Sequence, residues 1–374
     1  MSRPPIRVLL VEDSPIALVI LKRMLGSSPE IEVVGTAKGG KEALALIPQL
    51  QPNVICTDLN MPQMNGLEFT REVMARFARP ILVVSAAVQK ADNENVFKLL
   101  QAGAVDVFPK PAAGLASDYE RSRLELINKI KVLSGVTVFT QHRKEPSALG
   151  GVSAGSKTAS AKEQLSAQKL KNESYTRASI TSGKTPAKIL AIGASTGGPQ
   201  ALHTIISNLP ASFPVPVICI QHISEGFLQG LIDWLAGKSP MPVKIAPEGE
   251  LPRAGNIYFA PERHHLEFNS QGRFIYADAP PMSGHRPSVT TTFNSVAKFY
   301  GRASAGVLLT GMGRDGADGM QAIAQAGGLT IAQNEASCVV FGMPKEAIAL
   351  GAAQHILPIN DIAPMLLNKI SAKA

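Results

Sequence analysis

The sequence predicts an α/β protein in which a doubly wound (βα)5 domain is joined by a polar linker to a mixed α/β domain. Short apolar runs alternate with amphipathic segments in residues 6–131, and the alternation resumes at residue 189. Between them, residues 135–188 contain few large apolar side chains, so this stretch cannot offset its ordering entropy by burial. The chain has 374 residues and 45% of them are apolar, which is enough for two cores.

Five βα units are expected in the first domain. Ser14 is a candidate N-cap for its first helix, and Pro15 takes the first helical position. The alternation predicts a parallel sheet with helices on both faces. The predicted strands are residues 7–11, 32–35, 54–57, 81–84 and 105–108, and the predicted helices are 16–25, 41–50, 66–77, 93–102 and 121–132.

The second domain is expected to be mixed α/β and Rossmann-like. Its middle strands follow one another with short connections typical of hairpins, which favours some antiparallel pairing. The predicted strands are residues 189–192, 215–220, 256–260, 274–277, 305–309, 329–332 and 355–358. The predicted helices are residues 199–206, 291–300, 319–326 and 344–349.

The charge distribution argues against a nucleic-acid-binding fold. The net charge is +8, but residues 142–188 alone carry nine basic and three acidic side chains, whereas residues 189–374 carry twelve of each. A DNA-binding domain usually has a basic patch on the folded surface, and no helix-turn-helix pattern is visible. The basic segment is expected to be a solvated linker, with binding to an acidic surface as the alternative.

No membrane or secretory segment is expected. No apolar run approaches the ~20 residues that cross a bilayer. Glu12 and Asp13 interrupt the first apolar run early, which is unlike a secretory signal. Cys56, Cys219 and Cys338 are scattered singly in apolar contexts, as buried thiols of a reducing compartment are. We therefore expect a cytoplasmic protein.

Acidic residues end two strands of the first domain. Glu12 and Asp13 follow the first strand, and Asp58 follows the third. The carboxyl ends of parallel strands form one edge, so these carboxylates are expected to converge and to bind Mg²⁺. Asp58 can act as a nucleophile toward a phosphoryl group, with Lys110 pairing with its charge and Ser85 donating a hydrogen bond.

The combination of these motifs resembles the receiver domain of two-component response regulators, over residues 5–132. The matching motifs are Glu12-Asp13, Asp58 with Met61-Pro62-x-Met64-Asn65-Gly66, Ser85-Ala86 and Lys110-Pro111. The resemblance implies that Asp58 is phosphorylated by a histidine kinase and that Mg²⁺ is held by Glu12, Asp13, Asp58 and the carbonyl of Asn60. It also implies that Lys110 contacts the phosphoryl group and that Ser85 and Phe108 are switch residues. Asn65 stands where the family often has Asp.

A serine follows the first strand of the second domain, in Gly193-Ala194-Ser195-Thr196-Gly197. Its small neighbours allow a tight strand-to-helix turn, and the N–H groups from Thr196 onward lie at a helix N-terminus, where they can bind an oxyanion. Serine needs a base to act as a nucleophile. His222 and Asp315 each follow a later strand, so the three side chains are expected to converge as a triad.

The sequence of the second domain also allows other assignments of its functional site. The glycines do not match the dinucleotide or P-loop patterns, although a phosphate cradle is an alternative. The G-x-S-x-G signature also fits an α/β-hydrolase, whose order of Ser, Asp, His would need His355 as the base. His264-His265 lacks further metal ligands at helical spacing. His285-Arg286-Pro287-Ser288 is a polar loop that can contact a substrate.

The whole pattern resembles the chemotaxis protein-glutamate methylesterases, the CheB family, across residues 188–374. The segments that carry the resemblance begin at Ile192, Gln221, His285, Leu309 and Ala332. It implies a serine hydrolase with Ser195 as nucleophile, His222 as base and Asp315 as orienting carboxylate, with no cofactor for the esterase reaction. The backbone of Thr196 and Met312 is implied in the oxyanion hole.

The resemblance also implies the partners and the domain bounds. The substrates would be glutamate methyl esters, and certain glutamines, on the cytoplasmic helices of methyl-accepting chemoreceptors. A phosphorylated receiver at residues 5–132 would activate the catalytic domain at 188–374, with a linker at 133–187. A monomer that binds no nucleic acid and does not insert into the membrane is expected. A non-catalytic adaptor whose receiver controls partner choice is the alternative from another functional class.

Overall fold

The computed structural model describes residues 4–85, 90–111, 116–138 and 186–371, and every statement below concerns these ranges. Most of the predicted linker, together with Ala86, lies outside the described residues. The two α/β domains on either side of the linker belong to one compact unit. None of the described helices combines the length and apolarity needed to cross a membrane.

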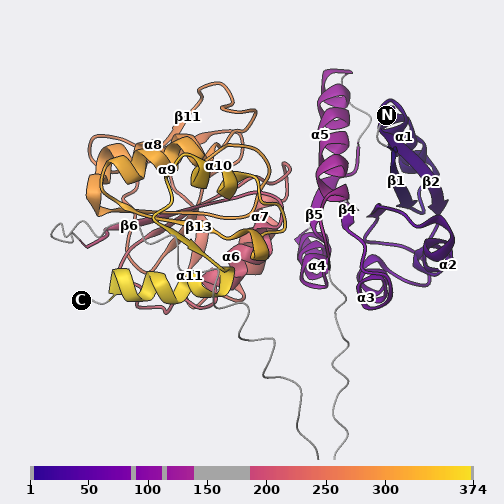
Figure 1. The fold of residues 1–374 in the computed structure, drawn as a ribbon, viewed down its shortest axis with the longest axis horizontal. Helices are drawn as coiled ribbons and strands as arrows, with labels where there is room; N and C mark the ends of the chain where they lie inside the picture. Colours follow the sequence, from indigo (N-terminus) through magenta and orange to yellow (C-terminus); the bar gives the residue numbers. More distant parts are fainter. Residues whose placement is uncertain (1–3, 86–89, 112–115, 139–185, 372–374) are drawn as a thin grey trace, which may run out of the picture. The chain divides into compact units, whose positions relative to one another are not determined.

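The first domain is a five-stranded parallel sheet with strand order β2-β1-β3-β4-β5 (Figure 1). All five predicted βα units are present, with bounds that differ by a few residues. They are β1 (Ile6–Val11), α1 (Pro15–Gly26), β2 (Ile31–Ala37), α2 (Gly40–Leu50), β3 (Val54–Thr57), α3 (Gly66–Arg76), β4 (Ile81–Ser85), α4 (Lys90–Gln101), β5 (Asp106–Pro109) and α5 (Ala116–Ser134).

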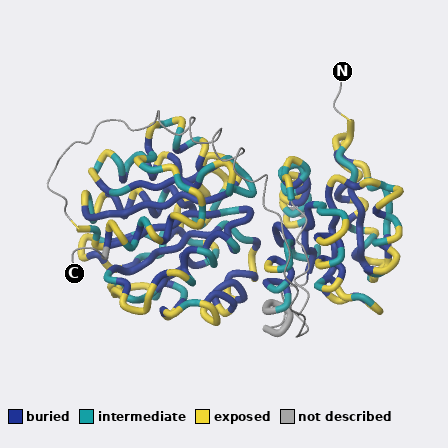
Figure 2. The backbone as a smooth tube through the Cα atoms, turned by 60° about the horizontal axis from the view of Figure 1, so that its bottom comes forward, coloured by how far each residue is buried: buried dark blue, intermediate teal, exposed yellow. Residues whose placement is uncertain are grey.

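The interior strand β1 packs against helices on both faces. Val8 and Leu10 belong to a core formed with α1 and α5, whereas Leu9 and Val11 belong to a core formed with α2, α3 and α4. This division follows from the two-residue period of a strand. Strands β1, β3, β4 and β5 are therefore mostly buried, whereas the edge strand β2 is only partly covered and the helices keep exposed faces (Figure 2).

Two helix starts fix the loops beside the acidic residues. The Ser14 side chain accepts a hydrogen bond from the Ala17 N–H at 3.3 Å, so the predicted cap of α1 is confirmed. Helix α3 begins with a capping box in which Asn65 and Glu68 each bond the other's backbone N–H. Such boxes satisfy two N–H groups that the helix itself leaves unpaired. Both helices thus start at defined residues next to the carboxyl edge.

The second domain has a seven-stranded sheet with order β14-β13-β12-β6-β7-β9-β8, and all pairs in it are parallel. Among the strands of this domain, antiparallel pairing is found in the separate hairpin β10–β11, and an isolated antiparallel bridge joins Met282 and His285. The elements are β6 (Ile189–Ala194), α6 (Gly198–Ile206), β7 (Val217–Gln221), α7 (Leu228–Ala236), β8 (Val243–Ile245), β9 (Ile257–Phe259), β10 (His265–Phe268), β11 (Phe274–Ala277), α8 (Val289–Tyr300), β12 (Ser304–Leu308), α9 (Ala317–Gln325), β13 (Leu329–Gln333), α10 (Met343–Ala349), β14 (His355–Leu357) and α11 (Ile359–Leu366).

Helices cover both faces of this sheet. Helices α8, α9 and α10 lie on one face, and α6 and α11 lie on the other (Figure 1). Each face has its own apolar core, and side chains of α7 contribute to the same core as α6 and α11. The elements α7, β8, β10 and α11 were not predicted from the sequence. The two strands among them have only three and four residues, too few to show a period.

In each sheet the order in which successive strands are added changes direction beside the first strand of that sheet. From β6 it moves through β7 toward β9 and then returns to β12 on the other side, so β6 and β12 are neighbours. In the first domain, β1 lies between β2 and β3 in the same way. Crevices at the carboxyl ends of such neighbouring strands are the usual ligand sites of open α/β sheets.

Candidate active site

Ser195 lies directly beyond β6 on a turn fixed by its own backbone. Its N–H donates to the Thr310 carbonyl at 3.0 Å, and its carbonyl accepts from the Gly198 N–H at 2.7 Å. Gly197 has φ +77°, and a Cβ there would lie 2.6 Å from Val339, so a larger residue would be strained and crowded. The turn therefore presents the serine at the start of α6.

His222 is the neighbour of Ser195 across two paired strands. Ala194 pairs with Gln221 in the β6–β7 register, and the His222 N–H donates to the Ala194 carbonyl at 2.9 Å. The register therefore brings Ser195 and His222 side by side at the carboxyl edge. The buried Gln221 side chain donates to the carbonyls of Ser195 and His222, both at 2.8 Å. The sequence does not predict this pair of hydrogen bonds from Gln221, which connects the two residues.

Asp315 is held at the N-terminus of helix α8. Its carboxylate accepts five hydrogen bonds at 2.7 to 3.0 Å, and its side chain is 1% exposed. A helix N-terminus favours a negative charge, because its first N–H groups have no partners within the helix. The donors are the Ser288 hydroxyl, the backbone N–H groups of Val289, Thr290 and Gly316, and His222 Nε2.

These contacts keep Asp315 ionised. Burial alone would raise its pKa, but the hydrogen bond and charge of His222, with the Ser288 and Thr290 donors, hold the pKa well below its ordinary value. An ionised carboxylate only accepts, so the 2.8 Å contact with His222 places a proton on Nε2. The other nitrogen, Nδ1, then carries a lone pair, as a general base requires.

Within the described ranges, Nδ1 of His222 and the hydroxyl of Ser195 both lack hydrogen-bond partners. Nδ1 of His222 is buried and makes no hydrogen bond to any described residue. Over the same ranges no hydrogen bond joins the Ser195 hydroxyl to His222, although the register makes them neighbours. Catalytic hydrogen bonds are often long before substrate binds and shorten in the complex. The structure therefore brings together His222 with Asp315 directly, and Ser195 with His222 through adjacent backbone.

A second imidazole covers the face of His222. The His285 ring stacks on it with centroids 3.8 Å apart and planes 8° apart. Burial lowers the pKa of His285 to about 4, with a further lowering by His222. The sequence had marked His285 only for its polar loop, because stacking across 63 residues leaves no local pattern. Ser288, by contrast, was detectable as an N-cap, since it precedes the apolar start of α8.

Two backbone N–H groups flank the serine. The Thr196 N–H follows Ser195 directly, and the Met312 N–H follows Gly311, where a Cβ would lie only 2.7 Å from the Ser195 Cβ. Neither N–H has a hydrogen-bond partner in the part of the chain that the structure describes. Their placement fits donors to an oxyanion, which need to be free until the reaction.

The alternative sites in this domain lack the required surroundings. His355 is the first residue of β14, so it lies at the amino end of an edge strand, opposite the carboxyl edge that holds Ser195. His264 pairs with Asp278 at 2.6 Å, and His265 accepts from the Ser288 N–H at 3.1 Å. Within the described ranges, the acidic group of the first domain is the one cluster with metal-binding geometry.

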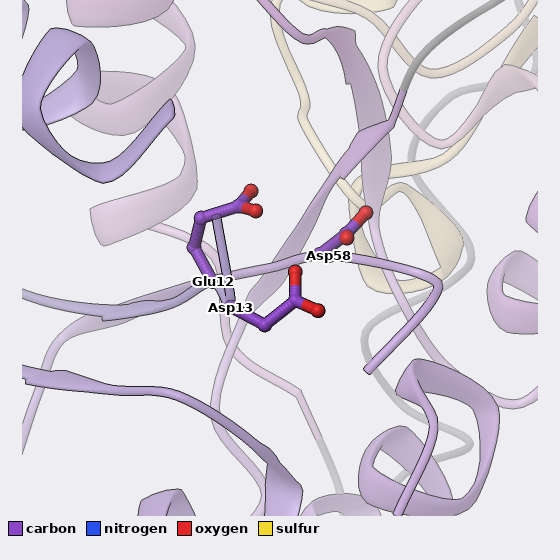
Figure 3. A group of neighbouring side chains, drawn as sticks. All are labelled: Glu12, Asp13 and Asp58. Atoms are coloured by element: carbon purple, nitrogen blue, oxygen red, sulfur yellow. The ribbon is translucent and has the colours of Figure 1, made fainter. Parts of the chain in front are cut away.

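That acidic group contains Glu12, Asp13 and Asp58 at the carboxyl edge (Figure 3). One ligand atom from each lies within 4.8 Å of the others. Burial raises the pKa of Glu12 and of Asp58, although hydrogen bonds from Lys110 partly oppose the change. Glu12 Oε2 is buried without a partner among the described residues. An unsatisfied buried carboxylate oxygen and two costly charges fit a hard divalent cation.

The other predicted residues of the first domain surround this group. Lys110 Nζ donates to Glu12 Oε1 at 2.9 Å and to Asp58 Oδ2 at 2.8 Å. The Lys110 N–H donates to the Ser85 carbonyl at 2.9 Å, which ties the ends of β4 and β5 together. Ser85 and Phe108 are buried. Asn60 is exposed, two residues beyond Asp58.

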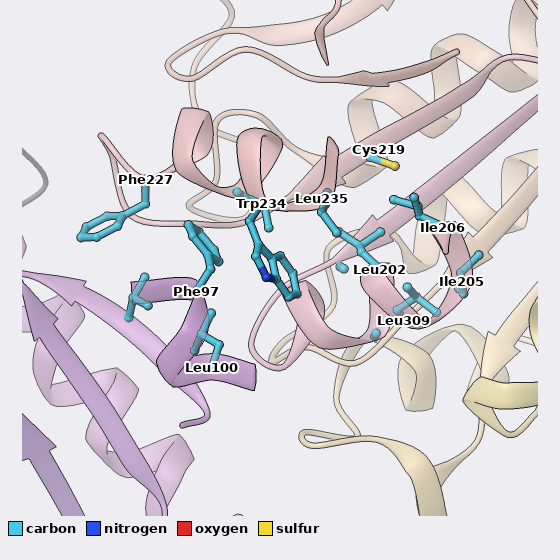
Figure 4. Packing of buried hydrophobic residues seen from close by; sticks show 14 of the residues in the cluster. Phe97, Leu100, Leu202, Ile205, Ile206, Cys219, Phe227, Trp234, Leu235 and Leu309 are labelled. Atoms are coloured by element: carbon cyan, nitrogen blue, oxygen red, sulfur yellow. The ribbon is translucent and has the colours of Figure 1, made fainter. Parts of the chain in front are cut away.

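The compact unit includes direct contacts between the two domains. The Phe97 ring of α4 stacks on Trp234 of α7 with centroids 5.6 Å apart (Figure 4). The Thr196 hydroxyl donates to Asp106 at 3.0 Å, and Asp106 also pairs with Lys129 of α5 at 2.7 Å. These contacts link α4 to α7, and β5 and α5 to the turn that carries the serine.

Three further hydrogen bonds and a cavity belong to the same interface. Gln200 donates to two backbone carbonyls at the end of α4, at 2.9 and 3.0 Å, and Ser224 donates to Glu125 of α5 at 2.9 Å. A cavity of about 350 Å³ adjoins Met312 and the end of α5. The lining includes Lys131, Val132, Val136 and Val339.

Comparison with known protein families covers both domains. Residues 190–366 match the family model described as CheB methylesterase, and residues 8–115 match the one described as response regulator receiver domain. A Thermotoga maritima structure titled as the CheB methylesterase catalytic domain is 39% identical, with a TM-score of 0.48. The match covers 49% of this chain and 99% of that one.

Full-length relatives have the same arrangement. A protein-glutamate methylesterase/protein-glutamine glutaminase of Nitrosospira multiformis is 38% identical over 368 residues, which is 98% of each chain. One from Syntrophus aciditrophicus is 39% identical over 364 residues, or 97% of each chain. The similarity therefore extends over both domains together.

Proposed function

The chain belongs to the protein-glutamate methylesterase/protein-glutamine glutaminase family, and from this premise we propose that Ser195, His222 and Asp315 carry out the hydrolysis. It is a hydrolase of protein glutamate methyl esters and glutamine amides in chemotaxis, under the control of a phosphorylated receiver domain. The observation that most supports the site is the 2.8 Å bond between His222 and an Asp315 carboxylate buried at a helix N-terminus.

Acylation begins when Ser195 Oγ attacks the side-chain carbonyl of the substrate. His222 Nδ1 takes the hydroxyl proton, and Asp315 stabilises the resulting imidazolium through Nε2. The Thr196 and Met312 N–H groups bind the developing oxyanion. The imidazolium then protonates the leaving group, which departs as methanol from an ester or as ammonia from an amide.

Deacylation repeats the same proton path with water. His222 removes a proton from water, the hydroxide attacks the acyl-serine, and Ser195 leaves with the proton returned from His222. The product is a glutamate side chain in both cases, since ester and amide give the same acyl group. One triad therefore serves methylesterase and deamidase activities.

Methanol release from methylated chemoreceptor membranes tests the site. Ser195→Ala is expected to lower the rate by several orders of magnitude, as loss of a triad member does. A matched control is Ser270→Ala, which removes an exposed hydroxyl from the turn between β10 and β11 of the same domain. Methanol release by Ser195→Ala at the rate of the unsubstituted protein would eliminate Ser195 as the nucleophile.

The receiver domain would be phosphorylated on Asp58. Glu12, Asp13, Asp58 and the Asn60 carbonyl would hold Mg²⁺, which neutralises charge on the incoming phosphoryl group. Lys110 leaves its present contacts with Glu12 and Asp58 to pair with that group. Ser85 and Phe108, both at the carboxyl edge, respond to the new contact as switch residues.

Regulation would act through the contacts between the domains. The unphosphorylated receiver restrains the serine turn through Asp106 and Thr196 and packs against α7 through Phe97. Phosphorylation shifts the equilibrium away from this arrangement and opens the site to receptor helices. Residues 188–374 alone are expected to be faster than the unphosphorylated full chain. An equal or lower rate for residues 188–374 would contradict this autoinhibition.

The partners follow from the reaction. The substrates would be methylated glutamates and certain glutamines on cytoplasmic helices of methyl-accepting chemoreceptors, and the phosphodonor would be a chemotaxis histidine kinase. The protein would work as a cytoplasmic monomer without nucleic acid or membrane insertion. Analytical ultracentrifugation before and after phosphorylation measures the molecular mass and so tests the proposed monomeric state.

A further inference from the structure

The ring of His285 stacks on one face of His222, the proposed base. Its ring lies parallel to that of His222, within 8°, at a centroid separation of 3.8 Å. Neither of its ring nitrogens makes a hydrogen bond to the residues that the structure describes. Its contact with the triad is thus the ring face rather than a proton path.

The bond to Asp315 does not by itself fix the plane of the His222 ring. That bond uses Nε2, which lies across the ring from Cγ and close to the Cβ–Cγ rotation axis. Rotation about this axis therefore moves Nε2 less than it moves Nδ1, which is bonded to Cγ. Nδ1 is the nitrogen that must meet Ser195, so a further contact has to set the ring plane.

The loop that carries His285 is rigid enough for this purpose. His285 and Met282 exchange backbone hydrogen bonds of 2.9 and 3.1 Å around a two-residue turn, in which Ser283 and Gly284 both have positive φ. Turns of this kind hold their flanking residues in a fixed register. Three residues later, Ser288 caps α8 and bonds Asp315. One loop thus supports both partners of His222.

We infer that His285 is a positioning residue, whose stacked ring fixes the plane of His222 so that Nδ1 faces Ser195. The inference rests on the proposed triad. A neutral ring suits this role, because a charged neighbour would oppose the imidazolium that His222 becomes. Burial and the neighbouring His222 lower the pKa of His285 to about 4, with a smaller lowering by Lys129 and an opposing effect of Asp315, so its ring is neutral at neutral pH.

Two substitutions separate stacking from other roles. In the full chain, activated with acetyl phosphate, His285→Ala is expected to lower kcat for methanol release by ~10- to 100-fold while KM changes less than about twofold. His285→Phe keeps a flat ring without nitrogens and is expected to recover kcat to within a few-fold. Thermal unfolding of both variants shows whether the fold is intact.

Three results would overturn the inference. The first is an unchanged kcat in His285→Ala. The second is a raised KM with unchanged kcat in the same variant, which indicates a substrate contact. The third is a His285→Phe protein as slow as His285→Ala, which indicates a chemical role for the imidazole. A parallel Ser195→Ala sample separates the two proposals. If that sample keeps its activity, the proposed triad fails; if it is inactive while His285→Ala is normal, only the positioning role fails.

Discussion

The hydroxyl of Thr196, one residue beyond the proposed nucleophile, donates a 3.0 Å hydrogen bond to Asp106 of the receiver domain. The same carboxylate is paired with Lys129 at 2.7 Å, so it is held in place on the receiver side. A hydrogen bond to a charged group contributes roughly 1.5–3 kcal/mol. This contact ties the state of the receiver directly to the turn that carries Ser195.

Asp106→Ala is therefore expected to raise the esterase rate of the unphosphorylated protein by about 10- to 100-fold. The loss of ~1.5–3 kcal/mol from the closed arrangement shifts the equilibrium toward the open one by roughly that factor. The measurement is methanol release without phosphodonor. The rate of the phosphorylated protein should change little, because that form is already open.

Asp118→Ala is the matched control for this substitution. It removes another acidic side chain of the receiver, whose partner Arg121 lies on the same exposed helix surface. Exposed pairs of this kind contribute little. An Asp106→Ala protein that folds but is as slow as the Asp118→Ala protein would show that the contact does not restrain the active site.

Trp234 reports on the same interface. It is the single tryptophan of the chain, it is 7% exposed, and it stacks on Phe97 of the receiver with planes 18° apart. Phosphorylation is expected to shift its fluorescence emission to longer wavelength as water reaches the indole. Phe97→Ala should produce part of this shift without phosphodonor.

The control for the fluorescence experiment is Asp58→Asn. This variant lacks the phosphoacceptor, so its emission should not respond to acetyl phosphate. An emission spectrum of the unsubstituted protein that stays constant while Asp58 becomes phosphorylated would show that the Phe97–Trp234 contact is not released.

Substitutions at Asp315 and Ser288 should lower the activity by different amounts, with the larger loss at Asp315. Asp315→Asn is expected to lower kcat by ~10³- to 10⁴-fold, because a neutral amide stabilises the imidazolium less and its NH2 group can donate to Nε2, which leaves the proton on the wrong nitrogen of His222. Ser288→Ala removes one of five donors and the cap of α8, so about 10-fold in kcat and roughly 1 kcal/mol of stability are expected. Equal losses in the two variants would contradict the assigned roles.

Much of the fold could be predicted because buried parallel strands leave apolar runs that end in polar residues. That pattern locates the carboxyl edges, and it therefore predicts Glu12, Asp58, Ser195 and His222 at strand ends, where the structure has them. The three-residue strand β8 was missed because so short a segment shows no period. The hairpin β10–β11 was only half predicted, since β10 begins with the polar His265.

The side-chain surroundings of the site could not be predicted in the same way. His285 reaches His222 from a turn, and a turn shows no period that points to its partner. Phe97 has the pattern of an ordinary buried position on an amphipathic helix. Nothing in the sequence distinguishes an apolar residue that packs within its own domain from one that stacks on Trp234. Such contacts depend on long-range packing.

Mg²⁺ should stabilise the receiver domain in a pH-dependent way. Burial raises the folded-state pKa of Glu12 and Asp58 above their ordinary values of 4.5 and 3.8. Without metal, their contribution to stability is therefore greatest below those ordinary values and is lost as pH rises through the raised ones.

Mg²⁺ binds the ionised forms, so its effect should be large at pH 7.5 and should fade as pH falls through the raised pKa values. At tenfold excess over Kd the gain is about 1.4 kcal/mol, which is a few degrees in Tm. Thermal unfolding with and without Mg²⁺ measures it, and Asp13→Asn should reduce the shift. A shift of equal size in Asp13→Asn, or one that grows toward low pH, would show that the cation binds elsewhere.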